Sequence, residues 1–156
     1  RFFRQLSLAV GGATAAMLGA PMVAFVLAPL GVKQPEVWRT VGRVEDFAVG
    51  ETRDVRYEDA SPLPWAGVTA RTAAWLRRES ETEFVAYSIH CTHLGCPVRW
   101  LKEAQLFMCP CHGGVFYKNG DVAAGPPDKP LARYPVRVEN GEVQIQTGPL
   151  PLLANK

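Results

Sequence analysis

The sequence lacks acidic residues over its first fifth and lacks a strong excess of either charge overall. None of its 15 acidic residues precedes Glu36, and no charged side chain lies between Arg4 and Lys33. The 17 Lys and Arg residues nearly balance the acids, so the net charge is only +2. A nucleic-acid-binding surface needs a clustered basic excess, and a nucleic-acid partner is therefore not expected. The sequence also has no internal repeat and no low-complexity tract.

The uncharged stretch is long enough to cross a membrane. Positions 5–32 carry no charge, and a helix needs roughly 20 apolar residues to span a bilayer. We therefore expect residues 1–30 to form a transmembrane anchor in contact with lipid. Arg1 and Arg4 precede it, and the positive-inside rule places the N-terminus in the cytoplasm of a bacterium and the rest of the chain on the periplasmic side of its cytoplasmic membrane. A cleaved secretory signal is the alternative, but its apolar segment would span only about 7–15 residues.

The remainder has the pattern of a small β domain. Short stretches rich in β-branched and aromatic residues alternate with turn signals. Residues 72–78 favour a helix by propensity, but the turn and strand that follow them favour a hairpin. Two Asn-Gly pairs, at 119–120 and 140–141, are typical of two-residue hairpin turns, in which both central residues need positive φ. The predicted division is an anchor, a hinge, a β domain and an irregular tail: residues 1–30, 31–36, 37–148 and 149–156.

The chemistry of the sequence is concentrated in two motifs, Cys91–Cys96 (CTHLGC) and Cys109–Gly114 (CPCHGG). Each offers cysteine and histidine at short spacing, so together they predict a two-sided metal site. A Cys2His2 zinc site fits the ligand count, although the two cysteines usually precede the two histidines. Two plain disulfides would leave His93 and His112 unexplained. The third interpretation is a [2Fe–2S] centre with two cysteines on one iron and two histidines on the other.

The two motifs in combination resemble those of the Rieske iron–sulfur proteins. This resemblance implies one [2Fe–2S] cluster per chain, with two thiolates on one iron and two imidazoles on the other, provided by Cys91, Cys109, His93 and His112. It also implies a disulfide between the two remaining cysteines, Cys96 and Cys111. The fold it implies is mostly β: a Rieske-type antiparallel domain with an inserted cluster-binding subdomain at about residues 88–127.

The implied disulfide and the anchor together are similar to the Rieske subunit of quinol-oxidising cytochrome bc-type complexes, respiratory or photosynthetic. Such a subunit takes an electron, with proton coupling, from quinol and passes the electron to a c-type cytochrome. The implied partners are a cytochrome b-type subunit with a quinol site and the c-type cytochrome, in a dimeric multi-subunit complex outside which the chain is not an active oxidoreductase. The alternative is the small Rieske subunit of a periplasmic molybdenum oxidase such as arsenite oxidase, which needs no retained helix.

The resemblance also implies roles for single residues. His112 would accept a hydrogen bond and a proton from quinol, while His93 and Leu94 would form the docking tip. The segment Gly125-Pro126-Pro127 resembles the proline-rich loop that covers the cluster. His90, beside the first motif, is interpreted as a non-ligand.

Two positions depart from the high-potential members of the family. Those members carry a serine directly after the Cys-His-Gly of the second motif and a tyrosine two residues later, and both hydroxyls raise the potential through hydrogen bonds to sulfur. The matching residues here are Gly114 and Phe116, which have no hydroxyl. We therefore predict a lower potential, matched to menaquinol.

Overall fold

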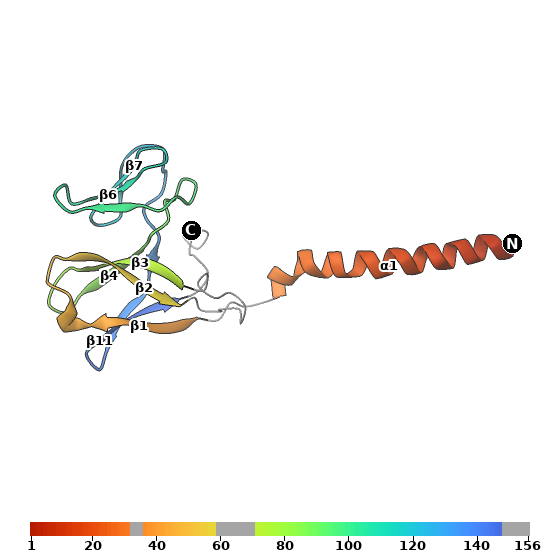
Figure 1. Ribbon diagram of the computed structural model, residues 1–156, viewed down its shortest axis with the longest axis horizontal. Helices are drawn as coiled ribbons and strands as arrows, with labels where there is room; N and C mark the ends of the chain where they lie inside the picture. Colours follow the sequence, from red (N-terminus) through yellow and green to blue (C-terminus); the bar gives the residue numbers. More distant parts are fainter. Residues whose placement is uncertain (32–35, 59–70, 148–156) are drawn as a thin grey trace. The chain divides into compact units, whose positions relative to one another are not determined.

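The computed structural model describes residues 1–31, 36–58 and 71–147 (Figure 1). The chain divides into two compact units, residues 1–34 and 35–156, and each is considered by itself. Most of the predicted hinge and all of the predicted tail at 149–156 lie outside the described residues.

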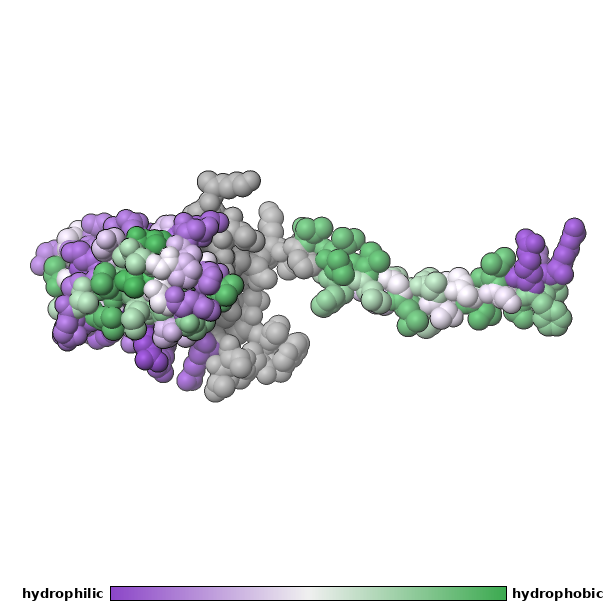
Figure 2. Space-filling model, turned by 90° about the horizontal axis from the view of Figure 1, so that it is seen from above, coloured by the Kyte–Doolittle hydropathy of each residue, from purple (hydrophilic) through white to green (hydrophobic). Residues whose placement is uncertain are grey.

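The first unit is a single helix, α1 (Phe2–Gly31). Its segment Phe2–Ala28 is long and apolar enough to cross a membrane, and its described side chains are not buried. Figure 2 shows the helix green to white along its length, with hydrophilic purple atoms gathered at its N-terminal end. The expected apolar N-terminal helix is thus confirmed.

The second unit is built from short strands in three antiparallel sheets, as the predicted mostly β fold requires. In the first sheet the order is β1-β11-β10, in the second β2-β3-β4-β9 and in the third β5-β6-β7-β8. The strand bounds are β1 (Val37–Arg43), β2 (Thr52–Glu58), β3 (Arg71–Arg78), β4 (Phe84–Ser88), β5 (Arg99–Leu101), β6 (Leu106–Cys109), β7 (Gly114–Tyr117), β8 (Val122–Ala124), β9 (Arg133–Tyr134), β10 (Val136–Glu139) and β11 (Glu142–Thr147). A 3-10 turn, η1 (Val44–Asp46), follows β1.

The first and second sheets form the base of the domain. Alternate residues of β2 point inward, so Val55 and Tyr57 are buried while their neighbours in the strand are more exposed. They join Leu76 of β3 and Val143 and Ile145 of β11 in one apolar core. This alternation is the period-2 pattern that the sequence shows in this region.

Strand β3 has apolar residues on both faces, which explains why its sequence was ambiguous. Ala74 and Leu76 face the core of the base, whereas Trp75 packs against a second core on the opposite face of the sheet. A strand covered on both sides shows no apolar–polar alternation. The preference for a hairpin over a helix in residues 72–78 is confirmed, because β3 pairs antiparallel with β4.

The third sheet carries the second core and lies apart from the base in Figure 1, where β6 and β7 are labelled. A cross-strand row of aromatic residues covers its inner face: Trp100 pairs with Phe107, which pairs with Phe116. The same core contains Cys91 and Cys109. The sulfur atoms of the sequence motifs therefore belong to a packed apolar core.

The two Asn-Gly turns differ from each other. Asn140 and Gly141 both have positive φ, as a two-residue hairpin requires. The prediction is wrong for the first pair, because only Gly120 has positive φ. There, Tyr117 N–H donates to the Asp121 carbonyl and Gly120 N–H donates to the Tyr117 carbonyl, which makes a three-residue loop ending in a left-handed glycine.

Candidate metal centre

The first motif forms a loop, here called the first loop (residues 91–96), closed by a short stem. Val98 N–H donates to the Ile89 carbonyl and Cys91 N–H donates to the Cys96 carbonyl, both at 2.8 Å. Within the loop, Gly95 N–H donates to the Cys91 carbonyl at 2.9 Å, with φ of 79° at Gly95. This hydrogen bond closes a turn, so the backbone from Cys91 to His93 is not extended.

The second motif, here called the second loop (residues 109–114), repeats that construction between β6 and β7. Gly113 N–H donates to the Cys109 carbonyl at 3.2 Å, and φ at Gly113 is 70°. Each loop therefore begins at a cysteine and closes through the N–H of a left-handed glycine four residues later. A side chain with a Cβ would be strained at either glycine.

A disulfide between Cys96 and Cys111 joins the two loops. It is the pairing that the family resemblance implied. Their Cα atoms are 6.5 Å apart, and the bond spans a sequence separation of 15 residues. The disulfide thus fixes the distance between the first loop, which precedes β5, and the second loop, which connects β6 and β7.

The two loop histidines meet at the surface. The ring centroids of His93 and His112 are 5.0 Å apart and the ring planes are perpendicular. Both side chains are exposed. Leu94 beside them is 70% exposed, which is unusual for a leucine outside a membrane-spanning helix and makes it an apolar projection next to the rings.

The remaining two cysteines, Cys91 and Cys109, are free thiols and each is only 2% exposed. Burial raises the pKa of the Cys91 thiol, and the neighbouring Cys109 raises it further. Hydrogen bonds from the backbone N–H groups of His93 and Leu94 act in the opposite direction and lower this pKa. Donors aimed at a sulfur atom stabilise a thiolate, so the loop backbone already provides for negative charge at Cys91.

The four side chains together offer two sulfur donors and two imidazole donors. The thiols lie in the apolar core and the imidazoles lie at the surface above the same two loops. The Sγ atoms of Cys96, Cys109 and Cys111 also lie within 4.8 Å of one another. Because Cys96 and Cys111 are bonded to each other, only Cys109 of that group can supply a thiolate.

A third segment packs against both loops and is here called the proline segment (residues 125–129). A Cβ built on Gly125 would lie 2.6 Å from the Gly113 carbonyl oxygen, and one on Gly114 would lie 2.8 Å from Pro127 Cγ. The Thr92 hydroxyl donates to the Lys129 carbonyl at 2.7 Å. Gly125 and Pro127 therefore lie against the second loop, while Pro126 is exposed.

Sequence reasoning missed the contacts that Thr92 and Trp75 make around the two loops. The indole Nε1 of Trp75 donates to the Val98 carbonyl at 3.2 Å, and its ring contacts Phe107 with centroids 5.9 Å apart. Trp75 thereby connects the base sheet with the stem of the first loop and with β6. Both contacts join residues far apart in sequence, and nothing in the local pattern around either residue marks them.

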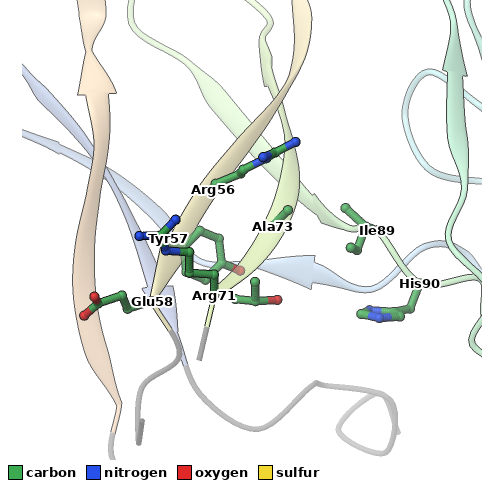
Figure 3. Close-up of a pocket in the computed structure, with 8 residues that line it drawn as sticks. Arg56, Tyr57, Glu58, Arg71, Ala73, Ile89 and His90 are labelled. Atoms are coloured by element: carbon green, nitrogen blue, oxygen red, sulfur yellow. The ribbon is translucent and has the colours of Figure 1, made fainter. Parts of the chain in front are cut away.

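His90 lies apart from the two loop histidines and lines a pocket of about 690 Å³ (Figure 3). Figure 3 shows His90 and Ile89 on one side of this pocket and the side chains from β2 and β3 on the other. The lining residues are Arg56, Tyr57, Glu58, Arg71, Thr72, Ala73, Ile89 and His90. None of the four free Cys and His side chains of the two loops lines it.

Comparisons with known proteins agree with the motifs. The family model described as the Rieske [2Fe–2S] domain matches residues 37–135. The chain is 30% identical to the menaquinol:cytochrome c reductase iron–sulfur subunit of Geobacillus thermodenitrificans, over 93% of this chain and 88% of the relative. It is 31% identical to the subunit of the same name from Bacillus subtilis, over 90% and 86%. The crystal structure of a plasma membrane Rieske protein from Synechocystis aligns with 69% of this chain and 97% of its own, at 27% identity and a TM-score of 0.51.

Proposed function

The chain belongs to the Rieske [2Fe–2S] family, and we propose that it is the cluster-carrying subunit of a membrane-bound menaquinol:cytochrome c oxidoreductase. The observation that carries this proposal is the placement of the donors: two perpendicular imidazoles at the surface and two free thiols buried in the core. A redox group held in this way is insulated on its sulfur side and open to a partner on its imidazole side.

The donor set fits a Rieske cluster in number and in type. Cys91 and Cys109 would hold one iron through thiolates, and His93 and His112 would hold the other through ring nitrogens. When bound, such a cluster supplies a one-electron acceptor with a potential of about −150 to +300 mV, well above that of an all-thiolate plant-type ferredoxin. The backbone N–H groups directed at Cys91 would add to this effect, because they stabilise extra negative charge on sulfur.

The exposed imidazoles provide the proton chemistry. Each ring has two nitrogens, so a ring that binds metal through one keeps the other available for a proton. We assign His112 as the acceptor of the quinol hydroxyl's hydrogen bond and proton. His93 and the exposed Leu94 would complete an apolar tip that enters the quinol site and excludes water from it.

Membership of a bc-type complex is supported by two independent features. The relatives from Geobacillus and Bacillus carry that role in their names, and they align with nearly the whole chain. The apolar helix α1 would keep the protein in the membrane beside a cytochrome b-type subunit. The helix argues against the small subunit of a periplasmic molybdenum oxidase, which has no need of it.

The proposed orientation of the chain in the membrane follows from the two arginines that precede the helix. Arg1 and Arg4 precede the helix without a counter-charge and would hold the N-terminus in the cytoplasm. The metal-binding unit would then face the periplasm, where a disulfide persists. Residues 31–36 would act as the hinge on which this unit moves between the quinol site and a c-type cytochrome.

Menaquinol is the proposed electron donor for a chemical reason. No hydroxyl is present at Gly114 or Phe116, so two hydrogen bonds that raise the potential in other family members are missing. A lower potential suits a quinol that is itself a strong reductant. Ubiquinol, the weaker reductant, should therefore reduce the purified protein only partly, whereas a menaquinol analogue should reduce it fully. A midpoint as high as that of the serine- and tyrosine-containing members would contradict the assignment.

The ligand assignment can be tested with the three histidines of the chain. His93→Asn and His112→Asn should each abolish the reduced-state EPR signal whose average g value lies below 2. His90→Asn is the matched control, because His90 lines a separate pocket. Its variant should keep the signal at wild-type intensity. An unchanged signal in either loop variant, or its loss in the control, would show that the assignment is wrong.

The complex itself is tested by isolation. Full-length protein extracted from membranes in mild detergent should bring with it subunits containing b-type and c-type haem. Co-purification with a molybdenum subunit and no haem would favour the alternative function.

A further inference from the structure

The free thiol of Cys109 lies beside the disulfide that links the two loops. Its Sγ atom is within 4.8 Å of the Sγ atoms of both Cys96 and Cys111. All three sulfur atoms belong to the same two loops, so their proximity is a property of the chain fold. From this separation, two sulfur atoms that approach each other equally need to move by at most about 1.4 Å each to reach the roughly 2.05 Å of an S–S bond.

We propose that Cys109 exchanges with the Cys96–Cys111 disulfide whenever it is not bound to iron. In this step Cys109 Sγ, as the thiolate, attacks Cys96 Sγ and forms a new S–S bond. The Cys96–Cys111 bond breaks, and Cys111 leaves as a thiolate that takes up the proton lost by Cys109. One disulfide is exchanged for another, so no outside oxidant or reductant takes part.

The surroundings favour Cys111 as the leaving group. Its side chain is exposed, so water can solvate the departing thiolate, whereas Cys96 is partly buried. Attack on Cys111 would instead join Cys109 to Cys111 across Pro110 alone, and the fixed φ of proline restrains so small a ring. The expected product is therefore a Cys96–Cys109 disulfide with a free thiol at Cys111.

The exchange would remove one metal ligand. It rests on the proposed function in one respect, namely that Cys109 is an iron ligand. The isomer would retain Cys91, His93 and His112 as donors but would have its fourth sulfur locked in a disulfide. Ligation of Cys109 would in turn protect the native pairing. Cluster insertion and disulfide formation are thus coupled, and a disulfide made before the cluster is in place is exposed to rearrangement.

Mass spectrometry of the full-length protein in detergent can follow the exchange. The cluster is removed at acid pH, where the thiols stay protonated, and exchange is started by raising the pH to about 8. Samples are quenched in acid and denaturant, labelled with N-ethylmaleimide without reduction, and digested with trypsin. Cleavage after Arg78, Arg99, Lys102 and Lys118 puts Cys91 and Cys96 in one peptide and Cys109 and Cys111 in another, so fragmentation locates each label.

The expected result is a transfer of label with no change in its total. At the start the labels lie on Cys91 and Cys109; with time the label on Cys109 should fall at least fivefold while that on Cys111 rises by the same amount. Cluster-loaded protein incubated in parallel should keep its labels on Cys91 and Cys109. Label that appears on Cys96 in place of Cys111 would mean that Cys109 attacked Cys111 and released Cys96. That result would support the exchange and overturn the assignment of Cys111 as the leaving group.

Two variants act as controls. Cys109→Ser has no attacking sulfur, so it should keep the Cys96–Cys111 disulfide and a single label on Cys91. Cys91→Ser keeps Cys109 and should still transfer its label. A label that stays on Cys109 in the cluster-free protein overturns the proposal, as does a fall in total label, which would mean oxidation. Transfer in the loaded protein as well would leave the exchange standing but would remove Cys109 from the ligand set.

Discussion

Gly114 should not accept a side chain unless the proline segment moves. A Cβ at this position would lie 2.8 Å from Pro127 Cγ, 3.1 Å from Pro127 Cδ and 3.5 Å from Cys109 Cβ. Ordinary contacts between carbon atoms are about 3.5–4.0 Å, so the first of these is short by roughly 0.7 Å. Pro127 is buried and its ring has no rotamer that would move it aside.

The magnitude follows from two opposing effects. Overpacking of a buried site costs about 1–3 kcal/mol. Replacing glycine by alanine where φ is not positive gains about 0.4–1 kcal/mol by restricting the unfolded chain. Gly114 does not have positive φ, so both effects apply and the overpacking is the larger. We therefore expect Gly114→Ala to lower the free energy of unfolding by about 1–2 kcal/mol.

The assay is urea denaturation of the full-length protein in detergent, followed by tryptophan fluorescence. Pro127→Ala removes the atoms that the new Cβ would overlap, so the double variant should recover at least half of the loss assigned to Gly114→Ala. A Gly114→Ala variant as stable as wild type would refute the steric argument. A double variant whose loss equals the sum of the two single losses would also refute it, because independent sites add and contacting sites do not.

Three further predictions concern the second core. Trp75→Phe should cost about 1 kcal/mol in urea denaturation through the lost hydrogen bond to Val98, whereas the same change at Trp100, for which no such bond is found in the described residues, should cost less. Phe116→Tyr restores the hydroxyl that the high-potential members carry at this position, so it should raise the midpoint potential by roughly 40 mV in an EPR-monitored titration. No rise would contradict the explanation of the predicted low potential. Burial raises the pKa of Tyr87, so wild-type stability should fall as the pH rises above 10, and Tyr87→Phe should flatten that fall; parallel curves for the two proteins would contradict it.

The parts of the fold that local chemistry determines could be predicted from the sequence. The helix α1 follows from the absence of charge between Arg4 and Lys33, because only a bilayer or a large core tolerates such a run. The turn at Asn140-Gly141 follows from the need for positive φ at both positions. The motif spacing identified both loops because cysteine and histidine at these separations serve few purposes other than binding metal.

The parts that depend on long-range contacts could not be predicted. The turn at Asn119-Gly120 differs from its counterpart, and the pairing of the strands it connects, β7 and β8, has a register shift between Val115 and Phe116. The hydrogen bond from Thr92 to Lys129 joins residues 37 positions apart, and no periodicity marks either partner. The turn from Cys91 to Gly95 also carries no clear local signal, although it needs the positive φ of Gly95.

The sulfur donors and the imidazole donors are held by different parts of the structure. We therefore expect mutations to affect the two kinds of donor differently. Cys109 is the last residue of β6 and Cys91 follows the stem of the first loop, so the sheets and the aromatic core position both sulfur atoms.

The imidazoles have no such support, because both rings lie on turns at the surface. Their perpendicular arrangement depends on three contacts of the loops: the disulfide, the hydrogen bond from Thr92 to Lys129 and the packing of Pro127 on Gly114. Weakening any of these contacts should therefore displace the imidazole rings before it displaces the sulfur atoms. The imidazoles are the groups that exchange protons and contact partners. Base-sheet substitutions should lower stability while leaving the pH dependence of the potential unchanged.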